Sequence, residues 1–275
     1  MTHFINTPNL FIYTALECEA KPLIKQFELK KEIFNHPFPI YKNDSIVLTI
    51  SGIGKVTMAG AVAYTQAIFQ FQHLPVLINI GIAGHKFESI GDILLASKIV
   101  DKDSGKRFYP QLIGTNLSKT SEVQTSSKPC TEYSASYMND MEASAFYETS
   151  VRFSSNELIH SIKVISDNEQ TTIESINAKK VSQLISNQLT QIEQLLNHWV
   201  LLQKSVIPSE LKEFNLILQQ WNFTVSGKIR LKSLLSRWQM LSAESWLTNN
   251  QAKLKSSKDV LKKLEIDINC LKVIL

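Results

Sequence analysis

Short apolar runs alternate along most of the chain with segments whose apolar residues recur every three or four positions. The runs with the composition of buried strands are 9–15, 45–50, 76–80, 92–100 and 160–166. The segments with helical spacing are 16–27, 56–71, 140–153 and 178–204. Continuous apolar strands that alternate with helices predict an α/β protein, with helices on both faces of the sheet.

Glycines and carboxylates gather where the predicted strands end. The stretch 52–54 follows the second strand and the stretch 81–84 follows the third, and each contains two glycines. Glu19 follows the first strand, and Asp167 ends the last one. Because ligands of open α/β sheets bind outside the carboxyl ends of the strands, we expect the functional site at this edge.

Each candidate carboxylate also fits an ordinary structural role. Glu19 fits a solvated position in the first turn of a helix, and Glu142 fits the solvent-exposed face of its helix. Asp167 fits a helix N-cap, because Asp accepts hydrogen bonds from the free N–H groups there. Spacing alone does not join the three carboxylates into one site.

The last quarter of the chain shows helical spacing only. Apolar residues recur with this spacing over 229–241 and 260–271, and Ser209 fits the N-cap of a further helix. All four tryptophans lie at or beyond position 199. We therefore predict two domains, an α/β domain over 1–204 and a basic, Trp-containing helical extension over 205–275.

The net charge of +4 is divided unevenly. Residues 1–200 hold 17 Lys and Arg against 19 Asp and Glu, whereas residues 201–275 hold 12 against 6. A basic helical segment permits contact with nucleic acid, through phosphate attraction and stacking, or with a protein partner. The alternative is a small apolar core whose lysines form a solvated face.

The composition excludes several classes of protein. With 44% apolar and 20% charged residues, the chain is typical of a soluble globular protein and not of a disordered one. No uncharged apolar run is long enough to span a membrane, and the amino-terminal segment reads as a strand. The three cysteines and six histidines lack disulfide or metal-ligand spacing. We therefore expect a cytoplasmic protein with no metal site.

Six short strings add information because of their order along the chain. They are ALECE (15–19), SGIGKV (51–56), NIGIAG (79–84), IGDI (90–93), DMEA (140–143) and ISD (165–167). Over about residues 9–200 they resemble the purine nucleoside phosphorylase/nucleosidase superfamily, above all the 5′-methylthioadenosine/S-adenosylhomocysteine nucleosidases. The resemblance implies a three-layer α/β/α fold with a twisted mixed sheet, usually assembled as a homodimer. It also implies cleavage of the N-glycosidic bond of a purine nucleoside without a metal or organic cofactor.

The resemblance also implies roles for individual residues. Glu19 matches the acid that positions and deprotonates the attacking water. Met141 and Glu142 match the ribose clamp, in which Glu142 accepts from the 2′ and 3′ hydroxyls. Asp167, helped by Ser166, matches the group that protonates purine N7.

Further positions match the family less uniformly. The backbone is expected to approach the ligand at Gly52, Ala83 and Gly84. Lys163, a candidate substrate-binding residue, stands where relatives have an arginine, and Ile82 replaces a small polar residue. The segment 103–137 is shorter than the one that supplies the aromatic wall of the base pocket in relatives. We therefore expect an altered or more open base pocket.

The choice between hydrolysis and phosphorolysis depends on a phosphate site. Related phosphorylases use arginines placed early in the chain, but the first arginine here is Arg107. Lysines lack the bidentate geometry of arginine, and Glu19 would repel phosphate. Water is thus the favoured nucleophile, and the first hypothesis is a nucleosidase. The departures from the family keep open a catalytically altered nucleoside-binding or scaffold protein that acts through its helical tail, and a phosphorylase is a weaker third possibility.

Overall fold

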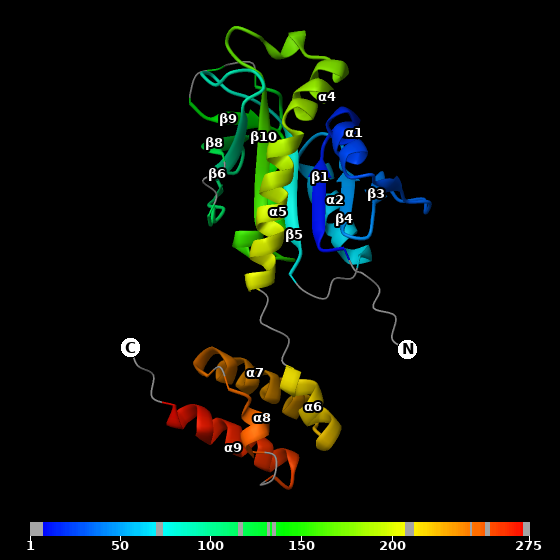
Figure 1. Cartoon of the computed structure of the whole chain (residues 1–275). Helices are drawn as coiled ribbons and strands as arrows, with labels where there is room; N and C mark the ends of the chain where they lie inside the picture. Colours follow the sequence, from blue (N-terminus) through cyan, green and yellow to red (C-terminus); the bar gives the residue numbers. More distant parts are fainter. Residues whose placement is uncertain are drawn as a thin grey trace. The chain divides into compact units, whose positions relative to one another are not determined.

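The chain consists of two compact units, Met1–Val206 and Ile207–Leu275, which we call the α/β unit and the helical unit (Figure 1). The computed structural model describes residues 8–69, 74–114, 118–130, 133, 136–206, 212–242, 244–250 and 254–271. The division falls two residues from the predicted boundary at 204/205.

Ten strands of the α/β unit, counted over its described residues, form one mixed sheet. They are β1 (Leu10–Thr14), β2 (Lys30–Lys31), β3 (Ile40–Lys42), β4 (Ile46–Ile50), β5 (Val76–Gly84), β6 (Ile93–Asp101), β7 (Arg107–Phe108), β8 (Lys119–Thr125), β9 (Met138–Asp140) and β10 (Ile159–Asp167). Strands β4, β1, β5 and β10 are parallel neighbours. Strand β6 runs antiparallel to β10, and pairing continues through β8 and β9 back to β5. The carboxyl ends of β1, β4, β5, β9 and β10 therefore lie near one another.

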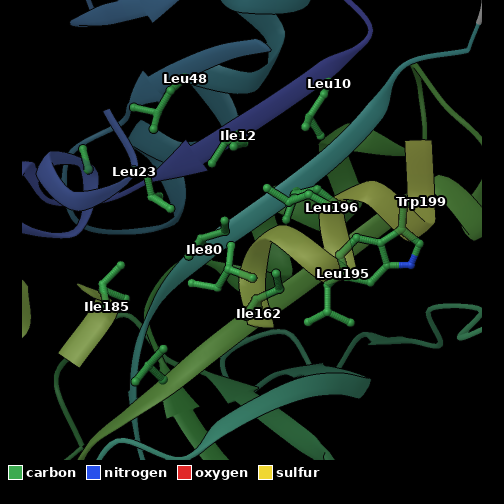
Figure 2. Packing of buried hydrophobic residues seen from close by; sticks show 14 of the residues in the cluster. Leu10, Ile12, Leu23, Leu48, Ile80, Ile162, Ile185, Leu195, Leu196 and Trp199 are labelled. Atoms are coloured by element: carbon green, nitrogen blue, oxygen red, sulfur yellow. The ribbon is translucent and has the colours of Figure 1, made fainter. Parts of the chain in front are cut away.

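Helices cover both faces of this sheet (Figure 1). They are α1 (Glu17–Gln26), α2 (Lys55–Ile68), α3 (Ala143–Ser150), α4 (Ala178–Asn187) and α5 (Leu189–Val206), with short 3-10 turns η1 (Asn156–Leu158) and η2 (Ile173–Ser175). Leu23, Ile185 and Trp199 bring α1, α4 and α5 into one apolar cluster (Figure 2). Met58 and Phe146 bring α2 and α3 into a second cluster. The predicted α/β architecture with both faces covered is therefore confirmed.

Two predicted helices have different bounds in the structure. The helix expected from Asp140 begins only at Ala143, because Asp140 ends β9 and its Oδ2 accepts from the Ala143 N–H at 2.8 Å. The helix expected over 178–204 is divided at Gln188, whose side-chain amide donates to the Gly91 carbonyl at 2.7 Å. In the first case the pairing of β9 with β5 and β8 overrides the helical spacing, and in the second the contact with the distant Gly91 does.

The helical unit has an apolar core of its own. Its helices are α6 (Lys212–Gln220), α7 (Val225–Leu241), α8 (Trp246–Asn250) and α9 (Ser257–Cys270). Leu231 and Leu235 of α7, Trp246 of α8, and Val260 and Leu264 of α9 are almost fully buried in one cluster. The tryptophans of this unit thus serve mainly in packing. The predicted N-cap Ser209 lies outside the described residues.

No helix in the described ranges is long and apolar enough to cross a membrane.

Candidate active site

A cavity of about 200 Å³ lies at the carboxyl ends of the central strands. Seven of the predicted site residues line it: Glu19, Ala83, Gly84, Met141, Glu142, Ser166 and Asp167. Its remaining walls include apolar side chains, among them Ile53, Ile82, Pro129 and Ile173. Gly52 and Lys163 are not among the lining residues. Gly52 has a φ of +82° in the turn between β4 and α2, a conformation that favours glycine.

Backbone donors from two strand ends hold Glu19 in the cavity wall. Its Oε2 accepts from the N–H groups of Ala15 and Leu16, both at 2.9 Å, and its Oε1 accepts from the Ile82 N–H at 3.0 Å. The residue is only 2% exposed, so the solvated role that the sequence also allowed is wrong. Burial raises the pKa of Glu19, while the three N–H donors and the charge of Lys163 oppose that rise.

Lys163 and Asp140 form a buried ion pair next to Glu19. The Lys163 Nζ lies 2.7 Å from Asp140 Oδ2, and the two side chains are 1% and 0% exposed. Burial by itself lowers the pKa of Lys163, but Asp140, Glu142 and Glu19 raise it above its ordinary value. The ammonium group is therefore charged at neutral pH. Lys163 acts here on the carboxylates of the site, not as a wall of the cavity.

Gly81 makes this close arrangement of charges sterically possible. A Cβ atom at Gly81 would lie 2.9 Å from Glu19 Oε1 and 3.6 Å from Lys163 Nζ. The first distance is shorter than any ordinary contact of a Cβ atom. Gly81 thus leaves room for the side chains of Glu19 and Lys163.

Glu142 occupies the N-cap position of α3 and is 8% exposed. Its Oε1 accepts from the Gly54 N–H at 2.7 Å, which joins the start of α3 to the start of α2. Burial raises the pKa of Glu142 to about 7, and the negative charge of Asp140 contributes to this rise. The alternative of a solvent-exposed helix face is therefore wrong for this residue.

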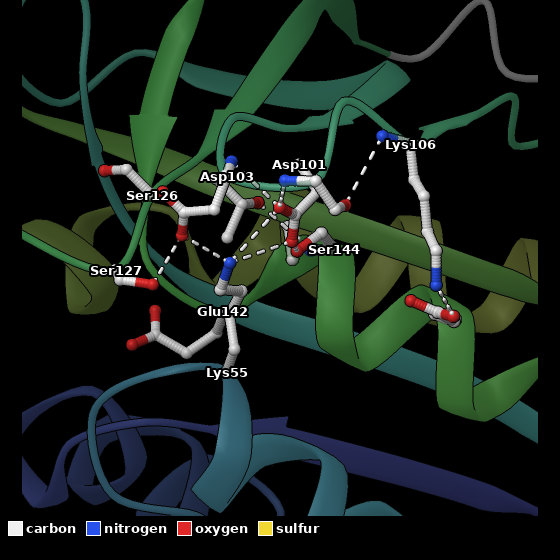
Figure 3. Close-up of polar contacts among 12 residues, drawn as sticks. Lys55, Asp101, Asp103, Lys106, Ser126, Ser127, Glu142 and Ser144 are labelled. Atoms are coloured by element: carbon white, nitrogen blue, oxygen red, sulfur yellow. Dashed lines mark hydrogen bonds and ion pairs between the residues drawn. The ribbon is translucent and has the colours of Figure 1, made fainter.

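A network of charged and hydroxyl groups lies beside Glu142 (Figure 3). Lys55 Nζ contacts Asp101 Oδ2 at 3.0 Å and Asp103 Oδ2 at 2.6 Å. Ser144 Oγ, in the first turn of α3, donates to Asp101 at 2.8 Å. Burial alone would raise the pKa of Asp101, but hydrogen bonds from Ser104, Lys55 and Ser144 lower it to about 2. The network fixes the two helix starts between which the Glu142 carboxylate is held.

Asp167 ends β10 at an irregularity in the pairing of β10 with β5. Ile165 pairs with Ala83 and Asp167 with Gly84, so Ser166 is the extra residue of a bulge. Such bulges redirect side chains, often next to active sites. Ser166 Oγ donates to Asp167 Oδ1 at 2.5 Å. The N-cap alternative is wrong, because the next helical segment, η2, begins only at Ile173.

Tyr133 is a contact of the site that the sequence reasoning missed. Its hydroxyl donates to Asp167 Oδ2 at 2.6 Å, and burial together with the Asp167 carboxylate raises the pKa of Tyr133. The phenol therefore stays protonated and acts as the donor of this hydrogen bond. A Cβ atom at Gly84 would lie 2.5 Å from Asp167 Oδ2 and 3.1 Å from Tyr133 Cε1, so Gly84 leaves room for both side chains. The only signal was the position of Tyr133 in the shortened segment 103–137.

The site combines a charged side with an apolar side. Three buried carboxylates, those of Glu19, Glu142 and Asp167, line one cavity together with aliphatic walls. Such a site can bind a ligand that has a flat apolar part and a hydroxyl-bearing part, and can stabilise positive charge on the latter. Over the described residues, no group of three or more His, Cys, Asp or Glu side chains is placed to hold a metal ion.

Several solved structures share the fold of this chain. The 5′-methylthioadenosine/S-adenosylhomocysteine nucleosidase of Neisseria meningitidis, solved with methylthio-immucillin-A, is 19% identical and superposes with a TM-score of 0.55, covering 67% of this chain and 97% of its own. The 5′-methylthioadenosine nucleosidase of Arabidopsis thaliana is 19% identical, with a TM-score of 0.56 over 70% and 96% of the two chains. The futalosine hydrolase of Helicobacter pylori is 17% identical, with a TM-score of 0.57 over 70% and 99%.

These similarities concern the fold. No model of a protein family matches the sequence, and no curated protein sequence matches it. The structural matches confirm that the chain contains the nucleoside phosphorylase/nucleosidase fold that the six sequence strings implied.

Proposed function

We propose that the α/β unit hydrolyses the N-glycosidic bond of a purine nucleoside. The observation that carries the proposal is the convergence of Glu19, Glu142 and Asp167 on one cavity, each less than one-tenth exposed. Loss of a base from ribose passes through an oxocarbenium-like state with positive charge on the sugar. Buried carboxylates placed around the sugar stabilise that charge.

In this proposal Glu19 positions and deprotonates the attacking water. Its Oε2 already accepts two backbone hydrogen bonds, whereas Oε1 accepts one from the described residues, that of the Ile82 N–H. A carboxylate oxygen has two lone pairs, so Oε1 can accept one further hydrogen bond from water. The pKa of Glu19, raised by burial, makes its carboxylate a stronger base than an exposed one.

Glu142 and Asp167 act on the two parts of the nucleoside. Ionised Glu142 accepts hydrogen bonds from the ribose 2′ and 3′ hydroxyls, with Met141 beside it in the cavity wall. Asp167, held by Ser166, gives a proton to N7 of the leaving purine, which would otherwise depart as an anion. General acid catalysis of this kind contributes about 10²–10⁴-fold to the rate.

The charge of the cavity supports water over phosphate as the nucleophile. Asp140, Glu19 and Glu142 surround one buried cation, Lys163. Carboxylates therefore outnumber ammonium groups here. A phosphate ion that approached Glu19 would add further negative charge in a region of low dielectric, where repulsion between like charges is strong. Burial raises the pKa of Glu142 to about 7, and the neighbouring charge of Asp140 adds to the rise, so that even the protein's own carboxyl is costly to ionise here.

The substrate class in this proposal is a purine nucleoside with a 5′ thioether substituent, of the 5′-methylthioadenosine or S-adenosylhomocysteine type. Aliphatic side chains of Ile53, Ile82 and Ile173 in the cavity wall support an apolar ligand surface.

We also propose a homodimer, as the resemblance implies. Ile53 and Val56, 56% and 86% exposed near the cavity, are apolar side chains that a second copy could cover.

A second candidate function is a nucleoside-binding protein without turnover. The contact between Tyr133 and Asp167 favours it, because the proton donor of the proposed reaction is already a hydrogen-bond acceptor at both oxygens. In this case the cavity binds a nucleoside and signals through a partner of the chain.

The test is the release of free base from a panel of nucleosides by the purified chain. The panel contains 5′-methylthioadenosine, S-adenosylhomocysteine, adenosine, inosine and futalosine, each with and without phosphate. Base release that does not require phosphate is the expected result. Strict dependence on phosphate would exclude a hydrolase. Binding of a nucleoside by calorimetry with no base release from any compound would leave the binding protein as the function.

A further inference from the structure

The helical unit keeps its carboxylates occupied internally. Four of them have a partner within the unit: Glu213 accepts from the Leu247 N–H, Asp259 from Ser256, Glu265 from Arg230, and Asp267 from Trp246 and Lys263. These carboxylates cap helices, join helices or satisfy an indole N–H. Among the described residues, they form no ion pair with the other cations of the unit.

Most of the described cations of the unit have no carboxylate partner. Two pair with a carboxylate, Arg230 with Glu265 and Lys263 with Asp267. Six exposed cations have no ion pair with any described carboxylate: Lys228, Lys232, Arg237, Lys255, Lys258 and Lys262. Five of these six cations lie on α7 and α9, and Lys255 precedes α9.

The spacing of polar residues arranges part of this charge in rows. Ser226, Arg230, Ser233 and Arg237 of α7 are separated by four, three and four positions, and all are exposed. On α9, Lys258, Lys262, Glu265 and Asn269 have the same spacing, and three of the four are exposed with Glu265 half-buried. Residues with this spacing lie on one face of a helix. Each helix therefore carries one polar row about 16 Å long, at 1.5 Å per residue.

One ion pair joins the two rows. Arg230 Nη2 of the first row lies 2.7 Å from Glu265 Oε2 of the second. Helices α7 and α9 also share the apolar cluster of the unit. The two rows therefore meet at the Arg230–Glu265 pair, beside the seam between α7 and α9. The other cations of the rows, Arg237, Lys258 and Lys262, have no ion pair with a described carboxylate.

We propose that this seam, which we call the basic seam, binds the phosphate backbone of a nucleic acid. Guanidinium, ammonium, hydroxyl and amide groups are the side chains that most often contact phosphate oxygens, and the two rows consist of them almost entirely. At 3.4 Å of helix axis per phosphate of one strand, a row of about 16 Å faces about five phosphates. The apolar stripes of α7 and α9, which a helix that binds a lipid surface needs, are packed in the core of the unit.

The test measures binding of fluorescein-labelled 20-mers, single-stranded and double-stranded, to the full-length chain by anisotropy between 50 and 200 mM NaCl. The test variant is Arg237→Gln/Lys258→Gln/Lys262→Gln. The control variant is Lys25→Gln/Lys30→Gln/Lys31→Gln, which removes the same charge from exposed positions of the α/β unit. Each phosphate contact contributes about 0.7–0.9 to the slope of log K against log salt. We therefore expect the test variant to lower that slope by about two to three, and the control variant to leave it nearly unchanged.

Three results would overturn the proposal. They are no binding of either oligonucleotide at 50 mM NaCl, an equal loss in the test and control variants, and binding that is limited to vesicles with 30% phosphatidylserine or to an acidic polypeptide such as polyglutamate. The double variant Lys258→Gln/Lys262→Gln leaves α7 unchanged and is the reserve if the triple variant has a lower melting temperature. It should lower the slope by about 1.5.

Discussion

In the α/β unit the charged groups of the cavity are buried, whereas in the helical unit nearly all the surplus charge is exposed. Lys163 and Asp140 have almost no solvent contact, and Glu19 is held by three backbone donors. In the helical unit, Arg237 and Lys258 have neither burial nor a described ion-pair partner. Buried charges are costly unless every one is paired, so their arrangement depends on the whole surrounding fold. Exposed charges cost little folding free energy, so their positions are less constrained by the fold and can suit the binding of a partner.

Among the buried groups of the cavity, the largest effect is expected at Asp167, the proposed proton donor. Asp167→Asn keeps the shape of the side chain but removes the proton that the purine receives. Base release should fall by about 10²–10⁴-fold, because one general acid is lost. Steady-state assays measure the rate, and Glu169→Gln, an exposed change two residues away, is the matched control. Unchanged turnover by Asp167→Asn would contradict the assignment.

A pair of tryptophan variants tests whether the two units fold separately. Trp199 and Trp246 are both fully buried, the first in the α/β core and the second in the helical core. Replacement of either by Ala should cost about 3–5 kcal/mol of unfolding free energy. In urea unfolding followed by circular dichroism, each variant should shift a different transition. Only Trp199→Ala should also lower base release, and a shift of both transitions by either variant would show that the units unfold together.

A pair of lysine variants compares buried with exposed ion pairs. Lys163→Met leaves Asp140 buried without its cation and should cost about 3–5 kcal/mol. Lys98→Met breaks the pair between Lys98 and Glu122, whose side chains are about one-third exposed, and should cost less than about 1 kcal/mol. Urea titration measures both. Equal costs would mean that the Lys163 pair contributes no more than one at the surface.

The pH dependence of ligand binding should follow the ionisation of the Glu142 carboxyl. Its pKa of about 7 means that the carboxyl is protonated at pH 6 and ionised at pH 8. Hydrogen bonds to the ionised carboxylate are stronger than those to the neutral carboxyl, so the affinity for 5′-methylthioadenosine should rise as the pH rises through 7. Calorimetry in Asp167→Asn, which limits turnover, measures the profile. Glu142→Gln should bind more weakly and show a much flatter profile, and the same rise in that variant would assign the titration to another group.

The smallest effect is expected at Tyr133. A ligand that bonds to Asp167 Oδ2 competes with the Tyr133 hydroxyl for that oxygen. Tyr133→Phe removes this competition, and a net hydrogen bond is worth about 0.5–1.5 kcal/mol. Binding of adenine should therefore become about 2- to 10-fold tighter, with Tyr137→Phe as the control. Weaker binding would show that Tyr133 contacts the ligand directly.

The fold was largely predictable because its central strands have unmistakable local patterns. Strands β1, β4, β5, β6 and β10 were expected within a few residues of their bounds, except for the longer carboxyl-terminal end of β5. The strands β2, β3, β7, β8 and β9 were not expected. Strand β8, with the sequence KTSEVQT, has few apolar residues, and its pairing is supplied by β6 and β9. A polar strand of this kind is specified by its neighbours in space.

The candidate site was predictable to the level of residue types and strand ends. Glu19, Glu142 and Asp167 were identified by their place in ordered strings, but each had a plausible solvent-exposed or capping role. Tyr133 was not identified, because a tyrosine in a short polar segment has no local pattern that marks it. Its role depends on a contact across 34 positions of sequence.

By itself, the sequence determined the periodicity of the elements, the order of the glycines and acids along them, and the uneven division of charge. These properties are local, since they depend on spacing along the chain. The tertiary structure decided which groups are buried together, that Lys163 pairs with Asp140, and that Gly81 and Gly84 make room for side chains. It also decided that Arg230 and Glu265 bring two polar rows together. Burial and pairing join residues that are distant in sequence, and no spacing rule along one chain contains that information.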